Sequence, residues 1–203
     1  DNIRAMGYIY GAPAQLVVRA DSNTTSAYLL RGKRVAVGNT GSGAAAHAER
    51  FFRHIGIWDE IYPTYMGYSA SAQAFLERRV DAFWVMMGYP SGIITEVTTK
   101  ADIRLVNIGI DALKSGFYNH FPYIPEIIPS GVYLSPVSGS GTPACQTFEE
   151  AAMLMTNKET SHNLVYNIMK TLWSSGGMSE MRRAKNTFHT MNLSNAFRGA
   201  AVP

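Results

Sequence analysis

The sequence predicts an α/β fold, and three observations predict it. Between residues 33 and 110, short apolar runs of strand length alternate with longer runs whose apolar residues recur at helical spacing. The run at 81–87 is almost continuously apolar, as expected of a buried parallel strand. Two glycine-bearing turns, 38–43 and 88–92, each follow a strand and precede a helix. Strands joined through helices predict right-handed crossovers and a mainly parallel, doubly wound sheet.

The first elements of this region are a strand, a helix and a second strand. The strand spans residues 34–37, and the helix spans 44–55, with Gly56 fitting the position after its end. A weaker strand follows at 61–66. The apolar face of the helix consists of Ala45, Ala48, Phe52 and Ile55.

The next strand places two large aromatic residues on opposite faces of the sheet. Phe83 and Trp84 are neighbours in a strand, so their side chains alternate, and the core is the default for both. The other elements expected here are a helix beginning near Ser69, the strand at 81–87, a helix at 91–99 and a strand at 103–108.

The two flanks are less regular. Residues 111–146 are rich in Gly, Pro, Ser and Tyr without a sustained period, which predicts a long connection. The elements expected in the flanks are a β-like run at 15–19, a strand at 151–156, a helix capped by Asn157 or Thr160 and stopped at Gly176-Gly177, and a last helix at 179–191.

Composition excludes several classes of function. The net charge of the 203 residues is +3, and basic residues cluster only in twos and threes, which disfavours a nucleic-acid partner. A single cysteine, Cys145, excludes an internal disulfide and any multi-cysteine metal site. The five histidines have no metal-ligand spacing, so we expect no metal and no cofactor. No segment is long and apolar enough to span a bilayer, and no signal peptide is visible.

The turn Gly38-Asn39-Thr40-Gly41-Ser42-Gly43 is the main candidate for ligand binding. It leads into a helix, whose first N–H groups lack intrahelical partners and favour an anion. The turn lacks the lysine of a P-loop, and its glycine spacing does not fit a dinucleotide fingerprint. Ser42 lies in G-S-G rather than in the G-x-S-x-G elbow of hydrolases. We therefore interpret Ser42 as a hydrogen-bond donor to a ligand and not as a nucleophile.

The second glycine-bearing turn is a candidate for the same cleft. Ligands of doubly wound sheets bind outside the carboxyl ends of the strands. Met87 and Tyr89 lie near the end of the strand at 81–87, and Gly88 and Pro90 can shape a pocket wall. The alternative is an ordinary strand-to-helix turn.

Several segments together resemble the TAXI-type solute receptors of TRAP transporters. They occur in the order of that family and cover nearly the whole chain. The segments are L-R-G-K-R-V-A-V-G-N-T-G-S-G (Leu30 to Gly43), G-Y-S-A-S-A (Gly67 to Ala72), R-V-D-A-F-W (Arg79 to Trp84), G-Y-P (Gly88 to Pro90), I-P-S-G-V-Y (Ile128 to Tyr133) and L-V-Y (Leu164 to Tyr166).

The resemblance implies a two-lobed clamshell of the type II periplasmic-binding-protein kind, with one complete doubly wound lobe and part of the second. Residues 1–24 would hold part of lobe 1 and the first hinge crossing. Residues 25–110 would form lobe 2, and residues 111–203 the return hinge and the C-terminal part of lobe 1. Receptors of the family are longer at the amino terminus, so the chain resembles a shortened member.

The resemblance also implies a set of ligand-binding residues. The turn after the first strand would dock a carboxylate, and the region from Trp84 to Pro90 would form the opposite part of the cleft. Family members often carry a hydroxyl residue directly after G-S-G, where this chain has Ala44. The full candidate set is Asn39, Thr40, Gly41, Ser42, Gly43, Ala44, Trp84, Met87, Gly88, Tyr89, Pro90 and Tyr133.

The function implied is capture without chemistry. The chain would be a periplasmic, extracytoplasmic receptor that takes up a small organic anion or amino acid, glutamate-like or dicarboxylate-like, and delivers it to TRAP membrane permease subunits. One alternative is an effector- or sensor-type ligand-binding domain of the same fold in a regulatory protein. An enzyme using Ser42 or a histidine is a third hypothesis, for which the sequence offers no acid–base pair at a motif spacing.

Overall fold

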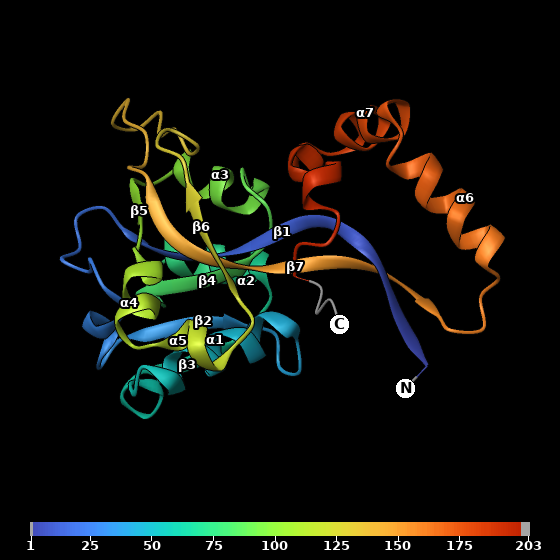
Figure 1. The fold of residues 1–203 in the computed structure, drawn as a ribbon. Coiled ribbons are helices and arrows are strands. Elements are labelled where there is room, and N and C mark those ends of the chain that lie inside the picture. The colour runs from blue at the N-terminus through green and yellow to red at the C-terminus, as the bar shows by residue number, and fades with distance from the viewer. Residues whose placement is uncertain (1, 200–203) are drawn as a thin grey trace. The chain divides into compact units, whose positions relative to one another are not determined.

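A computed structural model describes residues 2–199, apart from the side chain of Asn186 (Figure 1). These residues form two compact units, one of residues 13–149 and one of residues 2–12 with 150–199. The range 25–110, expected as lobe 2, lies wholly inside the first unit, which has wider limits at both ends.

The order of elements alternates strands and helices through most of the first unit. The strands are β1 (Ile3–Arg19), β2 (Arg34–Gly38), β3 (Tyr62–Tyr65), β4 (Ala82–Met86), β5 (Ile103–Leu105), β6 (Ile124–Ile128) and β7 (Cys145–Asn157). The α-helices are α1 (Gly43–His54), α2 (Tyr68–Leu76), α3 (Gly92–Thr98), α4 (Ile108–Lys114), α5 (Phe117–His120), α6 (His162–Leu172) and α7 (Ser175–Ala184). Short 3₁₀ helices are η1 (Ala27–Leu30), η2 (Trp58–Glu60), η3 (Asn186–Thr190) and η4 (Leu193–Asn195). The α/β class is confirmed, and every strand and helix predicted between residues 34 and 108 is present, although the last strand ends at Leu105 and Ile108 begins α4.

The sheet is mixed rather than mainly parallel. Its strand order is β3-β2-β4-β1-β7-β6, and β5 also pairs with β1. Strand β2 pairs in parallel with β3 and β4, whereas β1 is antiparallel to β4 and β5, with Leu16 opposite Trp84 and Val18 opposite Arg104. Because β1 is inserted antiparallel between β4 and β5, the expectation of a mainly parallel sheet is wrong. The apolar run at 81–87 correctly predicts a buried strand in parallel pairing, but it gives no information on the direction of β1, the strand on its other side.

Helices cover both faces of the sheet in the first unit. One face buries Val35, Val37 and Trp84 beneath α1, α4 and α5, and the other buries Ala36, Phe83 and Val85 beneath α2 and α3. Phe83 and Trp84 therefore lie in the core on opposite faces, as predicted. The aromatic rings that pack directly against Trp84 are Phe51, Phe52 and Phe148. Burial of each such side chain contributes about 1.5–3 kcal/mol.

Several boundaries in the first unit differ from the prediction. The β-like run expected at 15–19 is the end of a strand that begins at Ile3. Residues 111–146 contain α5 and β6, so the prediction of one long connection there is wrong. These two elements are only four and five residues long, which is too short for a hydrophobic period to show. Helix α2 has Gly67 as its N-cap, not Ser69.

The second unit contains α6 and α7, and its predicted boundaries also change. Ser161 caps α6, in place of Asn157 or Thr160, with Leu164 N–H donating to its hydroxyl at 3.3 Å. The predicted stop at Gly176-Gly177 and the helix at 179–191 are wrong, because both glycines lie inside α7. A Cβ on Gly177 would lie 2.0 Å from the carbonyl oxygen of Thr171, so only glycine fits this close approach of the two helices. Glycine has a low helix propensity, so two glycines disfavour the start of α7. The N-cap bond from Gly177 N–H to Ser174 Oγ, at 3.0 Å, stabilises this start.

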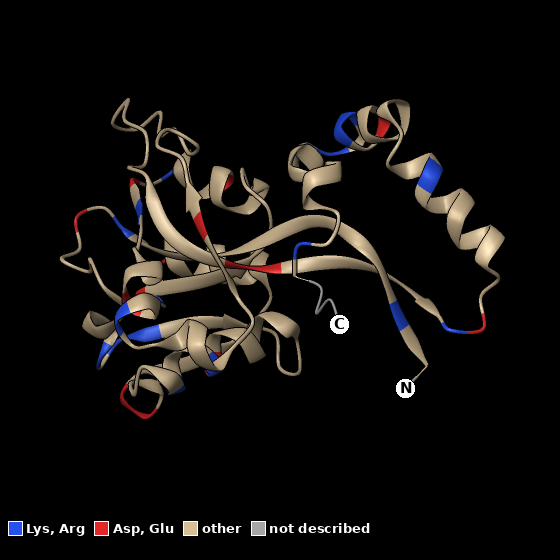
Figure 2. Cartoon of the chain, in the orientation of Figure 1, with Lys and Arg blue, Asp and Glu red and all other residues tan. Residues whose placement is uncertain are grey.

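Charged residues are absent from the middle of two strands, β2 and β4. Figure 2 shows β2 and β4 without charge through their middle, whereas β6 and β7 carry acidic residues within the strand, namely Glu126, Glu149 and Glu150. Among residues 2–199, no helix has both the length and the apolar character needed to cross a membrane.

Candidate functional site

The turn that follows β2 is built on two glycines with left-handed backbones. Gly38 has φ +110° and Gly41 has φ +73°. The N–H of Ser42 donates to the carbonyl of Asn39 at 3.0 Å and closes the turn. The N–H of Ala45 then donates to Ser42 Oγ at 3.2 Å, which makes Ser42 the N-cap of α1. The chain thus presents the start of α1 directly at the end of a buried strand.

Gly38 is also required because a side chain at this position would be too close to the first turn of α1. A Cβ on Gly38 would lie 3.1 Å from Ala44 Cβ, from the backbone nitrogen of Ala45 and from Ser42 Oγ. The first turn of α1 therefore sits directly against the end of β2. This close approach fixes the position of the Ser42 hydroxyl.

Three parallel strands end at the same edge of the sheet. Strands β2, β3 and β4 are neighbours in the order β3-β2-β4, and each is followed by a helix. Two of these helices are long enough to present a positive N-terminal end, namely α1 with 12 residues and α2 with 9. The arrangement brings N–H groups of two helices to one edge and suits an anion.

Asn39 and Tyr68 connect the ends of the strands to the start of α2. The side-chain amide of Asn39 lies 3.3 Å from the position that a Cβ on Gly67 would occupy. Tyr68 Oη accepts the N–H of Met86 and donates to its carbonyl, both at 3.2 Å. Sequence reasoning missed Tyr68, although Gly67-Tyr68 follows the strand at 61–66 in the same strand–glycine–helix pattern as the other two turns.

The turn after β4 is held by a buried polar network. Gln15 Nε2 donates to the carbonyl of Met87 at 2.8 Å, and the hydroxyl of Tyr133 donates to Gln15 Oε1 at 2.5 Å. The N–H of Ser91 donates to the same tyrosine hydroxyl at 2.9 Å, and Ser91 Oγ donates to Met87 Sδ at 2.9 Å. Burial raises the pKa of Tyr133 to about 12, so the phenol remains protonated. The buried hydroxyl of Tyr133 therefore holds the 87–91 turn in position through its hydrogen bonds to Gln15 and Ser91.

The structure places the predicted site residues at three depths. Trp84 is fully buried in the core, so its ring contributes to the position of β4 and is not presented at the edge. Asn39, Thr40, Gly41, Gly43 and Pro90 are exposed; Ser42, Ala44, Met87, Gly88 and Tyr89 are half-buried; Trp84 and Tyr133 are buried. The two turns follow adjacent strands, β2 and β4, and so lie at the same edge.

A polar cluster on α1 lies beside the glycine-rich turn. His47 Nδ1 contacts the hydroxyl of Tyr123, and Arg50 Nη1 donates to that hydroxyl at 2.7 Å. His47 Nε2 lies 3.9 Å from the position of a Cβ on Gly43, in the first turn of the helix. Within residues 2–199, no three His, Cys, Asp or Glu side chains are arranged to hold a metal ion. The local chemistry is that of hydrogen-bonding groups and the Arg50 cation beside a helix start.

Comparisons with known proteins place this geometry in context. The model of the NMT1-like family matches residues 1–203. A protein from Listeria monocytogenes described as an L-cystine ABC transporter superposes with a TM-score of 0.51 at 14% identity, over 90% of this chain and 62% of that one. The amino acid ABC transporter substrate-binding protein AbpA of Streptococcus pneumoniae, solved with bound L-arginine, gives a TM-score of 0.50 at 11% identity, over 92% of this chain and 61% of that one.

These likenesses concern the fold. The chain spans about three fifths of the length of the two solved structures, as the shares of 62% and 61% state. The neighbours have the two-lobed, type II periplasmic-binding-protein architecture, which confirms the predicted fold class.

Proposed function

The chain belongs to the NMT1-like family, and from this premise we propose that it is a solute-binding receptor that holds a small organic anion or amino acid. The finer assignment that we propose is a TAXI-type receptor that delivers a glutamate-like or dicarboxylate-like ligand to TRAP membrane permease subunits. We place it outside the cytoplasmic membrane, in the periplasm or its equivalent, and assign it no catalytic step. The segments quoted above for the TAXI resemblance, and the fold shared with substrate-binding proteins, support this proposal.

The main observation behind the proposal is that the first turn of α1 packs against the end of β2. The N–H groups of Gly43 and Ala44 lie in the first turn of a 12-residue helix and have no intrahelical acceptor. The hydroxyl of Ser42 accepts from Ala45 and keeps its own hydrogen to donate. A carboxylate placed there receives two backbone donors and one hydroxyl donor.

The carboxylate contacts supply a part of the binding free energy that can be estimated. Hydrogen bonds to a charged acceptor contribute about 1.5–3 kcal/mol each. The helix dipole adds about 0.3–2 kcal/mol for an anion at its N-terminus. Three such bonds, with the dipole, sum to about 5–11 kcal/mol, and association itself costs about 4 kcal/mol or more, so micromolar binding also requires contacts to the rest of the ligand. Asn39, Thr40 and Gly41 would form the wall beside the carboxylate, and Met87, Gly88, Tyr89 and Pro90 would contact the remainder of the ligand.

We propose that the two compact units belong to the two lobes of the receptor. Residues 13–149, around the core range 25–110, would be the docking lobe, and residues 2–12 with 150–199 would belong to the other lobe. The hinge would then lie where β1 and β7 pass from one unit to the other, at residues 12–13 and 149–150. Binding proteins of this kind close by hinge rotation at a few positions in such connections.

The experiment is a titration of the complete protein with L-glutamate and succinate by calorimetry. The decisive variant is Ser42→Asp, since aspartate is as good an N-cap as serine but repels a carboxylate. We expect affinity to fall at least about 100-fold, the loss of one charge-assisted bond plus repulsion, with an unchanged melting temperature.

The matched control is Ser161→Asp, which introduces the same charge at the N-cap of α6 in the other unit. It should bind as the wild type does. Equal affinity in Ser42→Asp and the wild type would place the ligand elsewhere, and turnover of the bound compound would favour an enzyme. Native mass spectrometry of protein purified without denaturation identifies any co-purified ligand.

A further inference from the structure

A cavity of about 430 Å³ lies at the opposite edge of the same sheet. Its lining comes from the end of β1 and the loop after it, from η1, from Lys33 just before β2, and from Arg78, Val80 and Asp81 just before β4. The parallel strands begin here, so this cavity and the Ser42 turn lie at different ends of the strands. Nothing in the proposed receptor function uses it.

The cavity is basic. Arg19, Lys33 and Arg78 line it, together with Asp21 and Asp81. Arg34 holds Asp81 through two side-chain hydrogen bonds, at 2.9 and 3.1 Å, and these lower the pKa of the Asp81 carboxyl below its usual range. The side chain of Asp21 is 71% exposed and lies 3.8 Å from Arg19 Nε, so water screens its charge.

Among the described residues, Lys33 and Arg78 form no ion pair, although the charge of Lys33 contributes to lowering the pKa of the nearby Asp81 carboxyl. Across residues 2–199, no carboxylate lies within ion-pair distance of either side chain. With Asp81 compensated by Arg34, the lining carries an excess of positive charge. An anion is the complement of such a lining.

The backbone conformation of Arg78 also indicates a role for its side chain. Arg78 has φ +58° and is the single non-glycine residue with positive φ in the described part of the chain. It is the first residue beyond the cap of α2, where its N–H donates to the carbonyl of Phe75 at 3.1 Å, and the N–H of Arg79 donates to that of Ala74 at 2.8 Å. This pair of bonds is a Schellman ending, in which glycine is the usual residue.

Helix α1 ends in the same Schellman motif, with the usual glycine in the left-handed position. Gly56, with φ +74°, occupies the equivalent position, and its N–H and that of Ile57 bond to the carbonyls of Arg53 and Phe52 at 3.0 and 2.9 Å. Arg78 keeps a long side chain at a position where glycine costs less strain. A strained residue retained beside a cavity indicates a role for its side chain.

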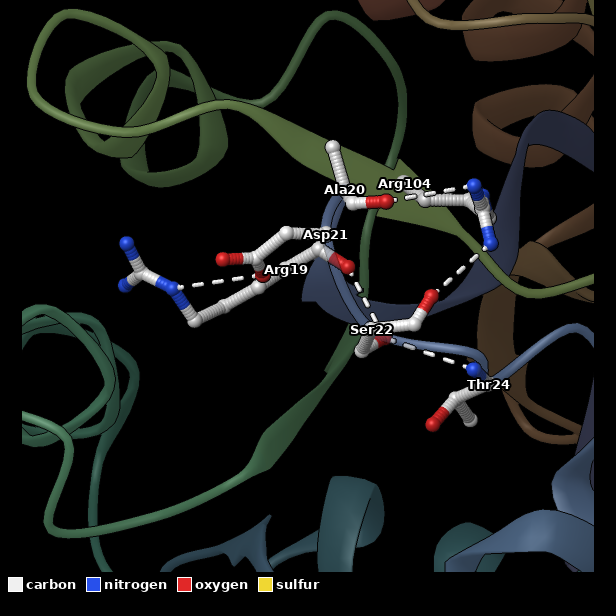
Figure 3. A network of polar contacts seen from close by, with 6 residues as sticks. All are labelled: Arg19, Ala20, Asp21, Ser22, Thr24 and Arg104. Carbon is white, nitrogen blue, oxygen red and sulfur yellow. Dashed lines mark hydrogen bonds and ion pairs between the residues drawn. The ribbon is translucent and has the colours of Figure 1, made fainter.

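The loop after β1, which lines the cavity, is held in place by hydrogen bonds (Figure 3). Arg104 of β5 donates to the carbonyls of Ala20 and Ser22 at 3.2 and 3.1 Å, and Ser22 Oγ donates to the carbonyl of Arg19 at 2.8 Å. Arg19 extends from the other side of this loop, and its buried Nε has no hydrogen-bond acceptor among the described residues. Arg104 thus holds the loop, while Arg19 lines the cavity with its Nε 3.8 Å from the Asp21 carboxylate.

We propose that this cavity binds a compact oxyanion with two negative charges, of the phosphate class, between Arg19, Lys33 and Arg78. Guanidinium groups bind phosphate oxygens with paired donors, and a lysine adds a point charge. The volume exceeds that of a free phosphate ion, so a phosphate monoester of a small molecule also fits. The oxyanion would join the end of α2 to the loop after β1.

The test is calorimetric titration of the complete protein with inorganic phosphate and, separately, with glycerol 3-phosphate, each against sodium chloride of equal ionic strength. The decisive variant is Arg78→Gly, since glycine prefers this backbone and the protein will fold. We expect binding about tenfold weaker or more, the loss of one charge-assisted contact, with no fall in melting temperature. Lys33→Gln should weaken binding to a similar degree.

The matched control is Arg79→Ala, the neighbouring arginine that pairs with Glu77 at 2.6 Å and does not line the cavity. It should bind as the wild type does. The proposal is overturned if neither phosphate compound binds beyond the salt control, if Arg78→Gly and Lys33→Gln bind normally, or if Arg79→Ala weakens binding equally. Tighter binding of glycerol 3-phosphate than of phosphate would identify a monoester as the ligand, and the reverse would identify the free ion. Ser42→Asp should leave this binding unchanged, which separates it from the receptor site.

Discussion

Arg34 and Asp81 join the starting ends of two neighbouring parallel strands. Arg34 Nε and Nη2 donate to the two carboxylate oxygens of Asp81 at 3.1 and 2.9 Å, and the backbone N–H of Arg34 donates to the same carboxylate at 2.8 Å. Arg34 Nη2 also donates to the carbonyl of Arg78 at 2.9 Å. The pair fixes the register in which Val35 lies opposite Ala82, and so the relative position of the two turns at the far edge.

The first prediction concerns the pH dependence of this pair. Hydrogen bonding from Arg34 lowers the pKa of Asp81 below its unfolded value. A carboxyl of this kind contributes stability above its unfolded pKa, and that stability is lost as pH falls through the folded pKa. We therefore expect Asp81→Asn to melt at a lower temperature than the wild type at pH 7, and the difference to shrink below about pH 4.

Thermal unfolding followed by circular dichroism between pH 7 and pH 3 measures this difference. Asp59→Asn is the control, because Asp59 is 89% exposed and lies 3.7 Å from Arg53. It should melt close to the wild type at every pH. A melting difference for Asp81→Asn that stays constant down to pH 3 would show that the charge of Asp81 does not stabilise the fold.

The second prediction concerns the close approach of α1 to β2. Gly38→Ala introduces both a disfavoured φ and three contacts at 3.1 Å, so we expect the free energy of unfolding to fall by about 2–3 kcal/mol. Gly41→Ala introduces the φ alone, since nothing lies within 4 Å of its Cβ position, and should cost about 1–2 kcal/mol. Gly92→Ala, in the first turn of α3 with open space around it, should change stability by less than about 1 kcal/mol.

Urea denaturation of the three alanine variants separates the two effects. Equal losses for Gly38→Ala and Gly41→Ala would mean that the backbone angle alone requires glycine at residue 38. The Ser42 hydroxyl would then not be fixed by contact with the strand.

Much of the first unit could be predicted because its signals are local. The apolar strand at 34–37, the glycines after it and the helical face of α1 lie next to one another in the sequence, and the structure has them within a residue of their expected limits. Ser42 follows from the same reasoning, because an N-cap is defined by its own neighbours. The direction of β1 depends on its partners, β4 and β5, which lie more than 60 residues away, and no local pattern encodes it.

The supports of the candidate site could not be predicted for the same reason. Tyr133 reaches Gln15 across 118 positions of sequence and Ser91 across 42. The family resemblance made Tyr133 a candidate for ligand contact, and the sequence around it has no period that would distinguish a buried tyrosine from an exposed one. Burial and two protein partners give it a supporting role that only the fold reveals.

The third prediction tests that supporting role. Tyr133→Phe leaves the N–H of Ser91 and the amide of Gln15 without their shared partner in a buried place, so we expect a loss of about 1–3 kcal/mol of stability. Urea denaturation measures the loss. Tyr65→Phe is the control, because Tyr65 is 45% exposed, and it should change stability by less than about 0.5 kcal/mol. Equal stability of Tyr133→Phe and the wild type would mean that water or a shifted Ser91 replaces the hydroxyl.

The fourth prediction concerns the one cysteine. Cys145 is 2% exposed, its thiol donates to the carbonyl of Val106 at 3.3 Å, and burial raises the pKa of the thiol to about 12. Because the thiolate is the reactive form, labelling of the folded protein by a disulfide reagent at pH 8 should be roughly a thousandfold slower than in urea. Between pH 7 and pH 10 the folded rate should keep rising about tenfold per pH unit, whereas the unfolded rate should level off above about pH 8.5. Cys145→Ser gives the background rate. A folded rate that levels off near pH 8.5 would show instead that reaction occurs through transient opening of the β7 region, since the opened thiol titrates as an exposed one.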